Sequence, residues 1–123
     1  MNITRHLHWS TDAHAALRET LGEDCASIIR SVEAGRAELY EIDKGGAWIV
    51  TTVVDSDLVI CCVAGRGLLE LGKVFAEIAR KNKLTRVRYF SSVGPQLQRL
   101  LKRGGWDVRE AGRVYHIHLN PVH

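Results

Sequence analysis

The stretch that decides the fold runs from Leu58 to Phe90 and reads LVICCVAGRGLLELGKVFAEIARKNKLTRVRYF. Its first part, Leu58–Ala64, is apolar on both faces of a strand, which is typical of a strand in the middle of a sheet. The segment Leu68–Lys81 carries its apolar side chains on one helical stripe and its charges on the other. Arg86–Phe90 has the pattern of a second strand. The stretch therefore predicts two parallel neighbouring strands joined by a right-handed crossover helix.

The sequence before this stretch predicts two helices. Ser10 and Thr11 can cap the first, in which apolar residues recur at helical spacing as far as Leu21, and Gly22 stands where a helix commonly ends. Cys25–Val32 repeats this spacing, with acidic residues before it and Gly35 at its end.

Three runs rich in β-branched and aromatic residues follow the helices, and short turns separate them. We expect an antiparallel meander, with the third run in the middle of the sheet. The runs are Leu39–Ile42, Ala47–Val54 and Leu58–Ala64, and the turns are Lys44-Gly45-Gly46 and Asp55-Ser56-Asp57.

After Phe90, the sequence predicts one more helix and two strands. Pro95 suits the first turn of the helix and Gly104 its end, and the strands are Trp106–Val108 and Arg113–Leu119. With a further strand before the first helix, the order of elements is β-α-α-β-β-β-α-β-α-β-β. A chain of 123 residues has the usual size of one domain, so we expect a single α/β domain with a mixed sheet over residues 1–123.

Charge is distributed unevenly along the chain. Residues 1–64 carry 5 Lys/Arg and 10 Asp/Glu, and residues 65–123 carry 12 and 4, so the halves have net charges of −5 and +8. The basic half favours an anionic partner, such as a phosphorylated cofactor, a nucleic acid or an acidic protein surface. Two halves that neutralise each other across one small domain would explain the same numbers.

The composition excludes several classes of protein. Three cysteines without a CxxC pair or zinc-finger spacing predict neither a disulfide framework nor a structural metal site. The longest apolar run, Leu58–Ala64, is far below the roughly 20 residues that a membrane-spanning helix needs. Met1–Ser10 has the pattern of neither a signal peptide nor a membrane anchor. We therefore expect a protein of the reducing cytoplasm with no membrane association.

The order of elements, and the segment Leu58–Trp106 in particular, resembles the GNAT superfamily of coenzyme A-dependent acyltransferases. The shared features are an apolar strand, a glycine-containing turn, an amphipathic helix, a strand, and a helix that ends at Gly105-Trp106, where family members often have Gly-Phe. The chain also resembles short GNAT-like proteins of bacteria and their phages. The resemblance implies a GNAT-like acyl-CoA N-acyltransferase fold, in which the two parallel strands splay apart at their C-terminal ends.

The resemblance also implies where coenzyme A would bind. GNAT proteins hold the cofactor pyrophosphate in the turn after the central strand, usually with the pattern Arg/Gln-x-x-Gly-x-Gly/Ala. Glycines let backbone N–H groups approach phosphate, and the helix N-terminus adds partial positive charge. A tight turn that holds no ligand is the alternative, because glycines commonly separate a strand from a helix. The implied strand and turn residues are Val63, Ala64, Gly65, Arg66, Gly67 and Leu68.

The sequence indicates the catalytic residues less directly than the cofactor-binding residues. Many GNAT enzymes protonate the departing thiolate with a Tyr in the helix after the fifth strand, but counting back from Gly105-Trp106 places Leu101 there, which cannot donate a proton. Other donors could be Tyr89, Ser91, Ser92 or Tyr115, although buried tyrosines more often serve in packing. Candidate general bases are Glu38, Glu41 and Asp43, which could equally form a solvated strand edge.

Two further groups of residues have alternative explanations. His6 and His8 share one strand face, as do His116 and His118, but a metal site would need these segments to meet, and the GNAT topology keeps them apart. A basic group could neutralise the 3′-phosphate of coenzyme A, contact nucleic-acid phosphates or form a solvated face. It comprises Arg80, Lys81, Lys83, Arg86, Arg88, Arg99, Lys102 and Arg103.

The sequence thus favours a GNAT-like protein that binds acetyl-CoA or a related acyl-CoA, without a metal, and transfers the acyl group to an amine. The alternative is a non-catalytic GNAT-fold module that binds a protein or a nucleic acid through its basic C-terminal half. A homodimer is compatible with either.

Overall fold

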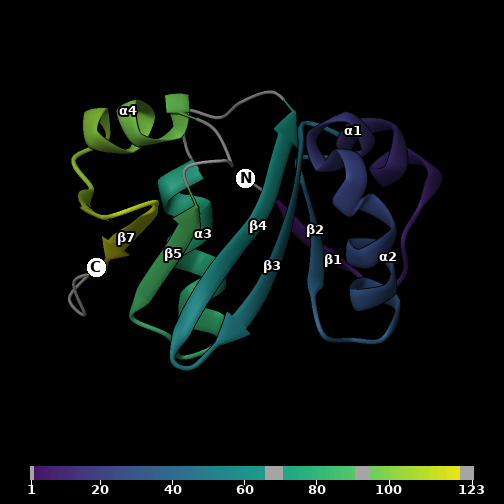
Figure 1. The fold of residues 1–123 in the computed structure, drawn as a ribbon, viewed down its shortest axis with the longest axis horizontal. Coiled ribbons are helices and arrows are strands. Elements are labelled where there is room, and N and C mark those ends of the chain that lie inside the picture. Colours follow the sequence, from purple (N-terminus) through teal and green to yellow (C-terminus); the bar gives the residue numbers. More distant parts are fainter. Residues whose placement is uncertain (1, 66–70, 91–94, 120–123) are drawn as a thin grey trace. The chain divides into compact units, whose positions relative to one another are not determined.

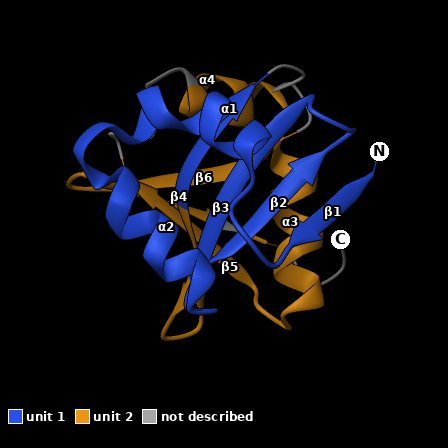
Figure 2. Ribbon diagram, turned by 90° about the vertical axis from the view of Figure 1, so that its right-hand side faces the viewer, with its two compact units in different colours: residues 1–52, 61–66 blue, residues 53–60, 67–123 orange. Residues whose placement is uncertain are grey.

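The computed structural model describes residues 2–65, 71–90 and 95–119 (Figure 1). The chain forms two compact units (Figure 2). The N-terminal unit consists of residues 1–52 and 61–66, and the C-terminal unit of residues 53–60 and 67–123. The division passes through two strands, β3 (Ala47–Val54) and β4 (Asp57–Gly65), so each unit contains part of both.

The N-terminal unit combines two helices with antiparallel strands. Helix α1 (Thr11–Leu21) begins as predicted, because the Ser10 side chain accepts a hydrogen bond of 3.1 Å from the Ala13 N–H. It ends at Gly22, whose φ of 53° favours glycine. A short 3₁₀ turn leads into α2 (Cys25–Glu33). Antiparallel pairs join β1 (Ile3–His6) to β2 (Glu38–Ile42) and β2 to β3.

A hydrophobic cluster within this unit joins α1 and α2 to the strands. The apolar residues of each helix recur at helical spacing, and alternate residues of a strand share one face, so one stripe of each helix meets the face of β2 and β3 that carries Leu39, Trp48 and Val50. The buried members of the cluster are Ala13, Leu17, Leu21, Val32, Ala37, Leu39, Trp48, Val50 and Cys62.

The strands pair in the order β1-β2-β3-β4-β5-β7-β6. β4 is therefore the middle strand of seven, as its apolar run predicts. β4 and β5 (Arg86–Phe90) are parallel, with a register that runs from the pair Asp57–Arg86 to the pair Ile60–Tyr89. Helix α3 (Leu71–Lys81) lies between them in the chain. The predicted parallel pair with a helical connection is confirmed.

In the C-terminal unit, α3 packs against β5. The apolar stripe of α3 is buried, with exposures of at most 3% at Leu71, Val74, Phe75, Ile78 and Ala79. Helix α4 (Pro95–Arg103) follows β5 and precedes β6 (Asp107–Ala111) and β7 (Val114–His118). β7 pairs antiparallel with both β5 and β6. No helix in the described parts of the chain is both long and apolar enough to cross a bilayer.

The predicted element order is confirmed, and the differences lie at turns. Asp57, expected in a turn, is the first residue of β4 and is buried. The predicted strand Trp106–Val108 is instead Asp107–Ala111, because the turn that ends it lies at Gly112, whose φ is 66°. Trp106 precedes this strand and packs against Gly72 of α3. Leu68, the predicted start of α3, lies outside the described residues.

Candidate functional site

β4 extends beyond the last residue that it pairs with β5. The register ends at Ile60–Tyr89, whereas β4 continues through Cys61 to Gly65. Val63 and Ala64 are partly exposed and Gly65 is exposed. A strand edge outside a ladder presents N–H and C=O groups to which another extended chain can add. Among the residues that the structure describes, Cys61–Gly65 has no partner on the β5 side, so its backbone could accept an extended ligand with amide groups.

Gly65 is required by packing within the N-terminal unit. Its φ is 128°, and a Cβ at this position would lie 2.4 Å from the Gly46 carbonyl oxygen and 2.5 Å from the Ala47 Cα. The end of β4 thus lies directly against the start of β3, which only glycine allows. This requirement exists without any ligand. The other implied turn residues, Arg66, Gly67 and Leu68, lie outside the described residues.

Two adjacent cysteines occupy the start of the β4 extension. Burial raises the pKa of Cys61 to about 11 and that of Cys62 to about 12. Cys62 belongs to the hydrophobic cluster, and Cys61 and Cys25 pack against it as partly buried neighbours. All three cysteines are free. At neutral pH Cys61 and Cys62 are protonated thiols, which behave as small apolar side chains.

The structure brings together two of the predicted proton donors, Tyr89 and Tyr115. They face each other across the β5–β7 pair, and their rings stack with centroids 5.1 Å apart and planes at 11°. Tyr89 is fully buried, and its hydroxyl has no hydrogen-bond partner among the residues that the structure describes. Burial, together with Tyr115, raises the pKa of Tyr89 to about 12. Tyr115 is partly exposed, and Ser91 and Ser92 lie outside the described residues.

The three candidate bases on and after β2 are engaged by the first residues of the chain. Glu38 accepts a hydrogen bond from the Tyr40 hydroxyl and lies 3.6 Å from an Arg5 guanidinium nitrogen. Glu41 lies 2.9 Å from His6 Nε2, and Asp43 accepts a hydrogen bond of 2.7 Å from the Asn2 N–H. These contacts fix β1 to β2.

The histidines form two separate sets. His6 pairs with Glu41, and its ring lies 5.2 Å from that of Trp48. His8 Nδ1 lies 2.9 Å from the Glu33 carboxylate; hydrogen bonds from His8 and from the Trp9 N–H hold the pKa of Glu33 below its usual value. β1 is an edge strand and β7 lies between β5 and β6, so the two histidine pairs belong to strands that are not neighbours. Within residues 2–65, 71–90 and 95–119 no three His, Cys, Asp or Glu form a metal-binding group.

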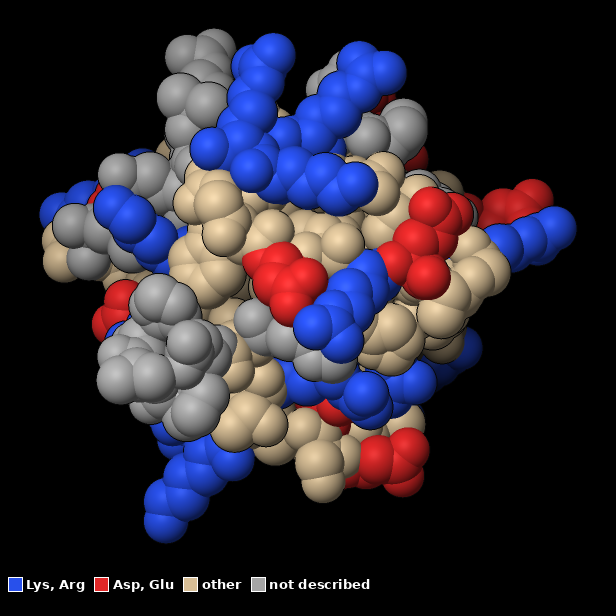
Figure 3. All heavy atoms as spheres, turned by 90° about the vertical axis from the view of Figure 1, so that its left-hand side faces the viewer, with Lys and Arg blue, Asp and Glu red and all other residues tan. Residues whose placement is uncertain are grey.

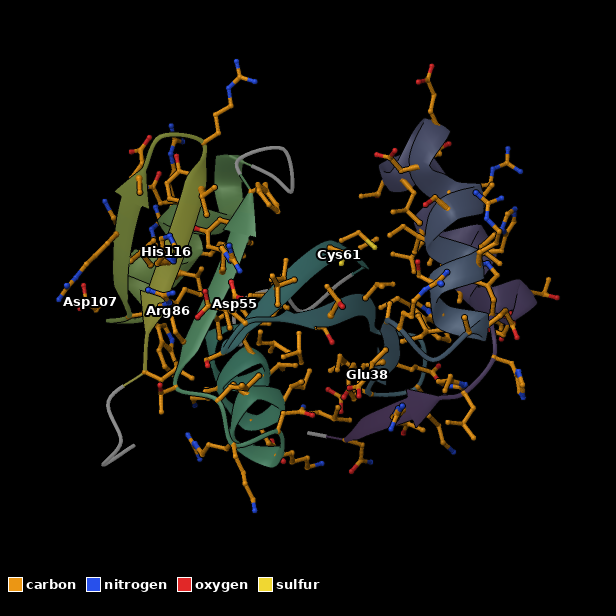
Figure 4. The ribbon with its side chains drawn as sticks, turned by 60° about the horizontal axis from the view of Figure 1, so that its bottom comes forward. Glu38, Asp55, Cys61, Arg86, Asp107 and His116 are labelled. Carbon is orange, nitrogen blue, oxygen red and sulfur yellow. The ribbon has the colours of Figure 1, made fainter. Side chains whose placement is uncertain are left out.

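Sequence reasoning missed a buried ion cluster at the start of β4. Arg86 Nε and Nη2 donate hydrogen bonds of 2.7 and 2.8 Å to the two carboxylate oxygens of Asp57, and Arg88 Nε lies 3.4 Å from the same group. Asp57 is 3% exposed, and the hydrogen bonds from Arg86 hold its pKa below the usual value. Arg86, from β5, is labelled in Figure 4. The basic pair two residues apart on β5 was the available signal, since such residues share a strand face.

The predicted basic residues come from α3, β5 and α4 and the turn after α3. Arg86 and Arg88 contact Asp57, as described above. Arg99, Lys102 and Arg103 lie on α4 and are exposed. Figure 3 shows basic side chains gathered on this part of the surface. Leu101, where counting back from Gly105-Trp106 predicts the position of the GNAT tyrosine, is buried at 2% exposure.

The sequence matches no model of a known protein family and no curated protein. The fold, in contrast, matches solved acetyltransferase structures. The Bacillus subtilis acetyltransferase in complex with CoA superposes with a TM-score of 0.65 and 16% identity over 97% of each chain. The Campylobacter jejuni N-acetyltransferase PseH in complex with acetyl coenzyme A gives a TM-score of 0.61 and 10% identity over 98% of this chain and 99% of the other.

A third similar structure is the GNAT-family acetyltransferase of Staphylococcus aureus, with a TM-score of 0.56 and 11% identity over 97% of this chain and all 100% of the other. The three matches cover nearly the whole chain and include the parallel β4–β5 pair that the sequence predicts. The chain therefore has the fold of the GNAT-family acetyltransferases.

Proposed function

We propose that the protein binds acetyl-CoA or a related acyl-CoA and transfers the acyl group to an amine. The observation that carries the proposal is the extension of β4 past its register with β5. Two of the structures with the same fold contain CoA or acetyl-CoA, which supports the choice of ligand.

The extension Cys61–Gly65 fits the pantetheine arm of CoA chemically. This arm is a thin, extended chain with two amides, and an extended protein backbone offers N–H and C=O groups at matching intervals. Val63 and Ala64 have small, partly exposed side chains, which leave the backbone accessible. In this proposal Val63 and Ala64 pair with the arm by hydrogen bonds similar to those of a sheet.

The pyrophosphate would lie at the turn that follows β4. Gly65 is already fixed by its packing on Ala47, so Gly67 is the position at which a side chain would interfere with a ligand. Arg66 would add charge, and the N-terminal end of α3 would add backbone N–H groups.

Bound acyl-CoA would supply an acyl group activated as a thioester, which a neutral amine attacks with loss of the thiolate. The chain must then take a proton from the amine and provide one to the sulfur. Tyr115 is the better placed of the two candidate tyrosines for exchange with solvent, because it is partly exposed whereas Tyr89 is fully buried. Ser91 and Ser92 are the remaining candidate donors.

The test is calorimetric titration of acetyl-CoA into the wild type and into Gly67→Val, with folding of the variant checked by circular dichroism. The wild type should bind and Gly67→Val should bind much more weakly, since the added side chain would crowd the phosphates. Arg66→Ala is the control: it should lose only a salt-sensitive part of the affinity. Equal affinities of the wild type and Gly67→Val would show that this turn does not bind the pyrophosphate.

The alternative, a non-catalytic module that binds a protein or a nucleic acid, is favoured by one observation. Leu101 is apolar and buried where many GNAT enzymes carry a catalytic tyrosine. If neither acetyl-CoA nor CoA at millimolar concentration binds, the alternative replaces the proposed function. Binding without acyl transfer to any amine would support a CoA-binding protein that lacks catalysis.

A further inference from the structure

Tyr89 carries a buried hydroxyl that the fold leaves without a hydrogen-bond partner. The residue is fully buried, and its hydroxyl has no partner within residues 2–65, 71–90 and 95–119. Val87 and Ile117 lie on the same face of β5 and β7 as Tyr89 and are at most 1% exposed, so the surroundings are apolar. A hydroxyl removed from water destabilises the folded state unless another group accepts its hydrogen bond. The position therefore fits a ligand that supplies an acceptor.

Tyr89 also lies at the last pair of the β4–β5 register. Its partner in this pair is Ile60, and the next residue of β4 is Cys61, labelled in Figure 4. Cys61 begins the extension that, in the described part of the chain, has no partner on the β5 side. Tyr89 thus leaves the sheet at the point where the two strands stop pairing.

The reactive end of the proposed ligand would be directed toward this point. If the pyrophosphate binds at the turn after Gly65, the pantetheine arm runs back along β4 toward Cys61. The extension Cys61–Gly65 spans about 16 Å at the rise of a β-strand, which is comparable with the length of an extended pantetheine arm. The thioester at the end of the arm would therefore lie beside Cys61, next to the pair Ile60–Tyr89.

We propose that Tyr89 donates a hydrogen bond to the carbonyl oxygen of the bound thioester and thereby recognises the acyl group. This assignment rests on the proposed binding of acyl-CoA along β4. The carbonyl oxygen suits the hydroxyl better than the thioester sulfur does, because sulfur accepts hydrogen bonds only weakly. In apolar surroundings such a hydrogen bond is stronger than in water.

Tyr89 acts in this proposal as a hydrogen-bond donor that keeps its proton. Burial, together with the nearby Tyr115, raises the pKa of Tyr89 to about 12, so the hydroxyl stays protonated at neutral pH. A fixed donor stabilises the negative charge that the carbonyl oxygen gains during acyl transfer. Exchange of a proton with solvent is left to a more accessible group, such as the partly exposed Tyr115.

The first measurement is urea denaturation of the protein without any ligand. Tyr89→Phe removes only the hydroxyl, so the variant should be at least as stable as the wild type. Lower stability of Tyr89→Phe would show that the hydroxyl already has a partner in the ligand-free protein, and this result would overturn the proposal.

The deciding experiment is a calorimetric comparison of acetyl-CoA with S-ethyl-CoA, in which a methylene replaces the carbonyl group. The wild type should bind acetyl-CoA about tenfold more tightly, the effect of one buried hydrogen bond. Tyr89→Phe should bind the two compounds equally. If the wild type shows no preference, or if Tyr89→Phe keeps it, the proposal is wrong.

Thr51→Val is the matched control for this comparison. Thr51 is 1% exposed, and its hydroxyl also has no hydrogen-bond partner among the described residues. It lies on β3 and pairs with Glu38 of β2, so its removal should leave the preference for acetyl-CoA unchanged. If Thr51→Val abolishes the preference as Tyr89→Phe does, the effect does not come from the Tyr89 hydroxyl, and the proposal is wrong.

The same titrations distinguish the failure of this proposal from that of the proposed function. Equal binding of acetyl-CoA and S-ethyl-CoA by the wild type would remove the role of Tyr89 and retain the binding of acyl-CoA. If neither compound binds at millimolar concentration, the proposed function fails, and the role of Tyr89 fails with it.

Discussion

Gly72 allows α3 to pack closely against Trp106, the residue before β6. A Cβ at this position would lie 2.1 Å from Trp106 Nε1, so the indole ring occupies the space of the missing side chain. In an exposed helix, Gly→Ala stabilises by about 1 kcal/mol. Here we expect Gly72→Ala to lower the free energy of unfolding by about 2 kcal/mol in urea denaturation, because the ring must move.

A double-mutant cycle with Trp106→Leu checks the cause. The smaller side chain makes room for a Cβ, so Gly72→Ala should cost less in the Trp106→Leu background. An increase in stability of the single variant Gly72→Ala would show that the ring does not occupy this space.

Asp57 makes the stability of the C-terminal unit depend on pH at the acidic end. Its pKa is below the usual value of 3.8 in the folded protein, mainly because of hydrogen bonds from Arg86. The stabilisation is therefore present above the unfolded pKa and is lost as the pH falls through the lowered folded pKa. We expect Asp57→Asn to lower the free energy of unfolding by about 2 kcal/mol at neutral pH. This loss is smaller than that for a fully buried ion pair, because Arg86 is half-exposed.

The measurement is urea denaturation of the wild type and Asp57→Asn at neutral pH and near pH 3. The difference between them should shrink as the pH falls. Asp55→Asn is a matched control, since Asp55 is exposed, and should change stability little at either pH. A difference for Asp57→Asn that persists unchanged in acid would contradict an ionic role.

Cys61 and Cys62 should react slowly with alkylating reagents in the folded protein. Their pKa values of about 11 and about 12 leave little thiolate at pH 8, roughly 100-fold less than a free cysteine for Cys61 and roughly 1,000-fold less for Cys62. Alkylation by iodoacetamide, followed by peptide mass spectrometry, should show slow labelling in buffer and rapid labelling in urea. Equal rates in the two conditions would mean that the end of β4 is not buried as described.

At the scale of elements, α1 offers a direct check of its capping. Ser10→Ala removes the acceptor for the Ala13 N–H and should cost about 1 kcal/mol. Ser27→Ala, at an exposed position inside α2, removes a serine that caps no helix and should have a smaller or opposite effect. Chemical denaturation of the two variants measures the difference; equal losses would show that Ser10 does not stabilise α1 by capping.

The order of elements was predictable because periodicity marks each helix and strand locally. The β4–β5 pair followed from the length and pattern of the connecting helix. The end of the β4–β5 register did not follow, because the apolar run Leu58–Ala64 continues across it without any change in composition. The sequence predicts a turn at Asp57, because its partner Arg86 is distant in sequence and is brought to it only by the parallel register.

From sequence, residues of the candidate site could be grouped only where they are adjacent on one strand. Val63, Ala64 and Gly65 are contiguous, so the resemblance could place them together. Gly65 has an additional role that sequence could not reveal, its close approach to Ala47. The stacking of Tyr89 on Tyr115 depends on the β5–β7 register, which no local pattern of the sequence predicts.

At the scale of the whole molecule, the fold is shared with proteins of 10–16% identity. Such similarity establishes the arrangement of elements and leaves the chemistry to individual residues. The charge asymmetry is real at this scale, with −5 in residues 1–64 and +8 in residues 65–123. Part of the basic half is engaged, since Arg86 and Arg88 contact Asp57 and Arg109 contacts Asp107. Exposed cations remain on other elements, among them Arg80 of α3 and Arg99 of α4.

The central claim is that acyl-CoA binds along the β4 extension, and backbone amide chemical shifts measured during a titration with acetyl-CoA test it most directly. We expect saturable shifts at Val63, Ala64 and Gly65, whose backbone would pair with the pantetheine arm, and smaller changes at β1, which is at the far edge of the sheet. An absence of shifts at these three residues at millimolar acetyl-CoA, or shifts confined to the basic surface of α4, would contradict the account.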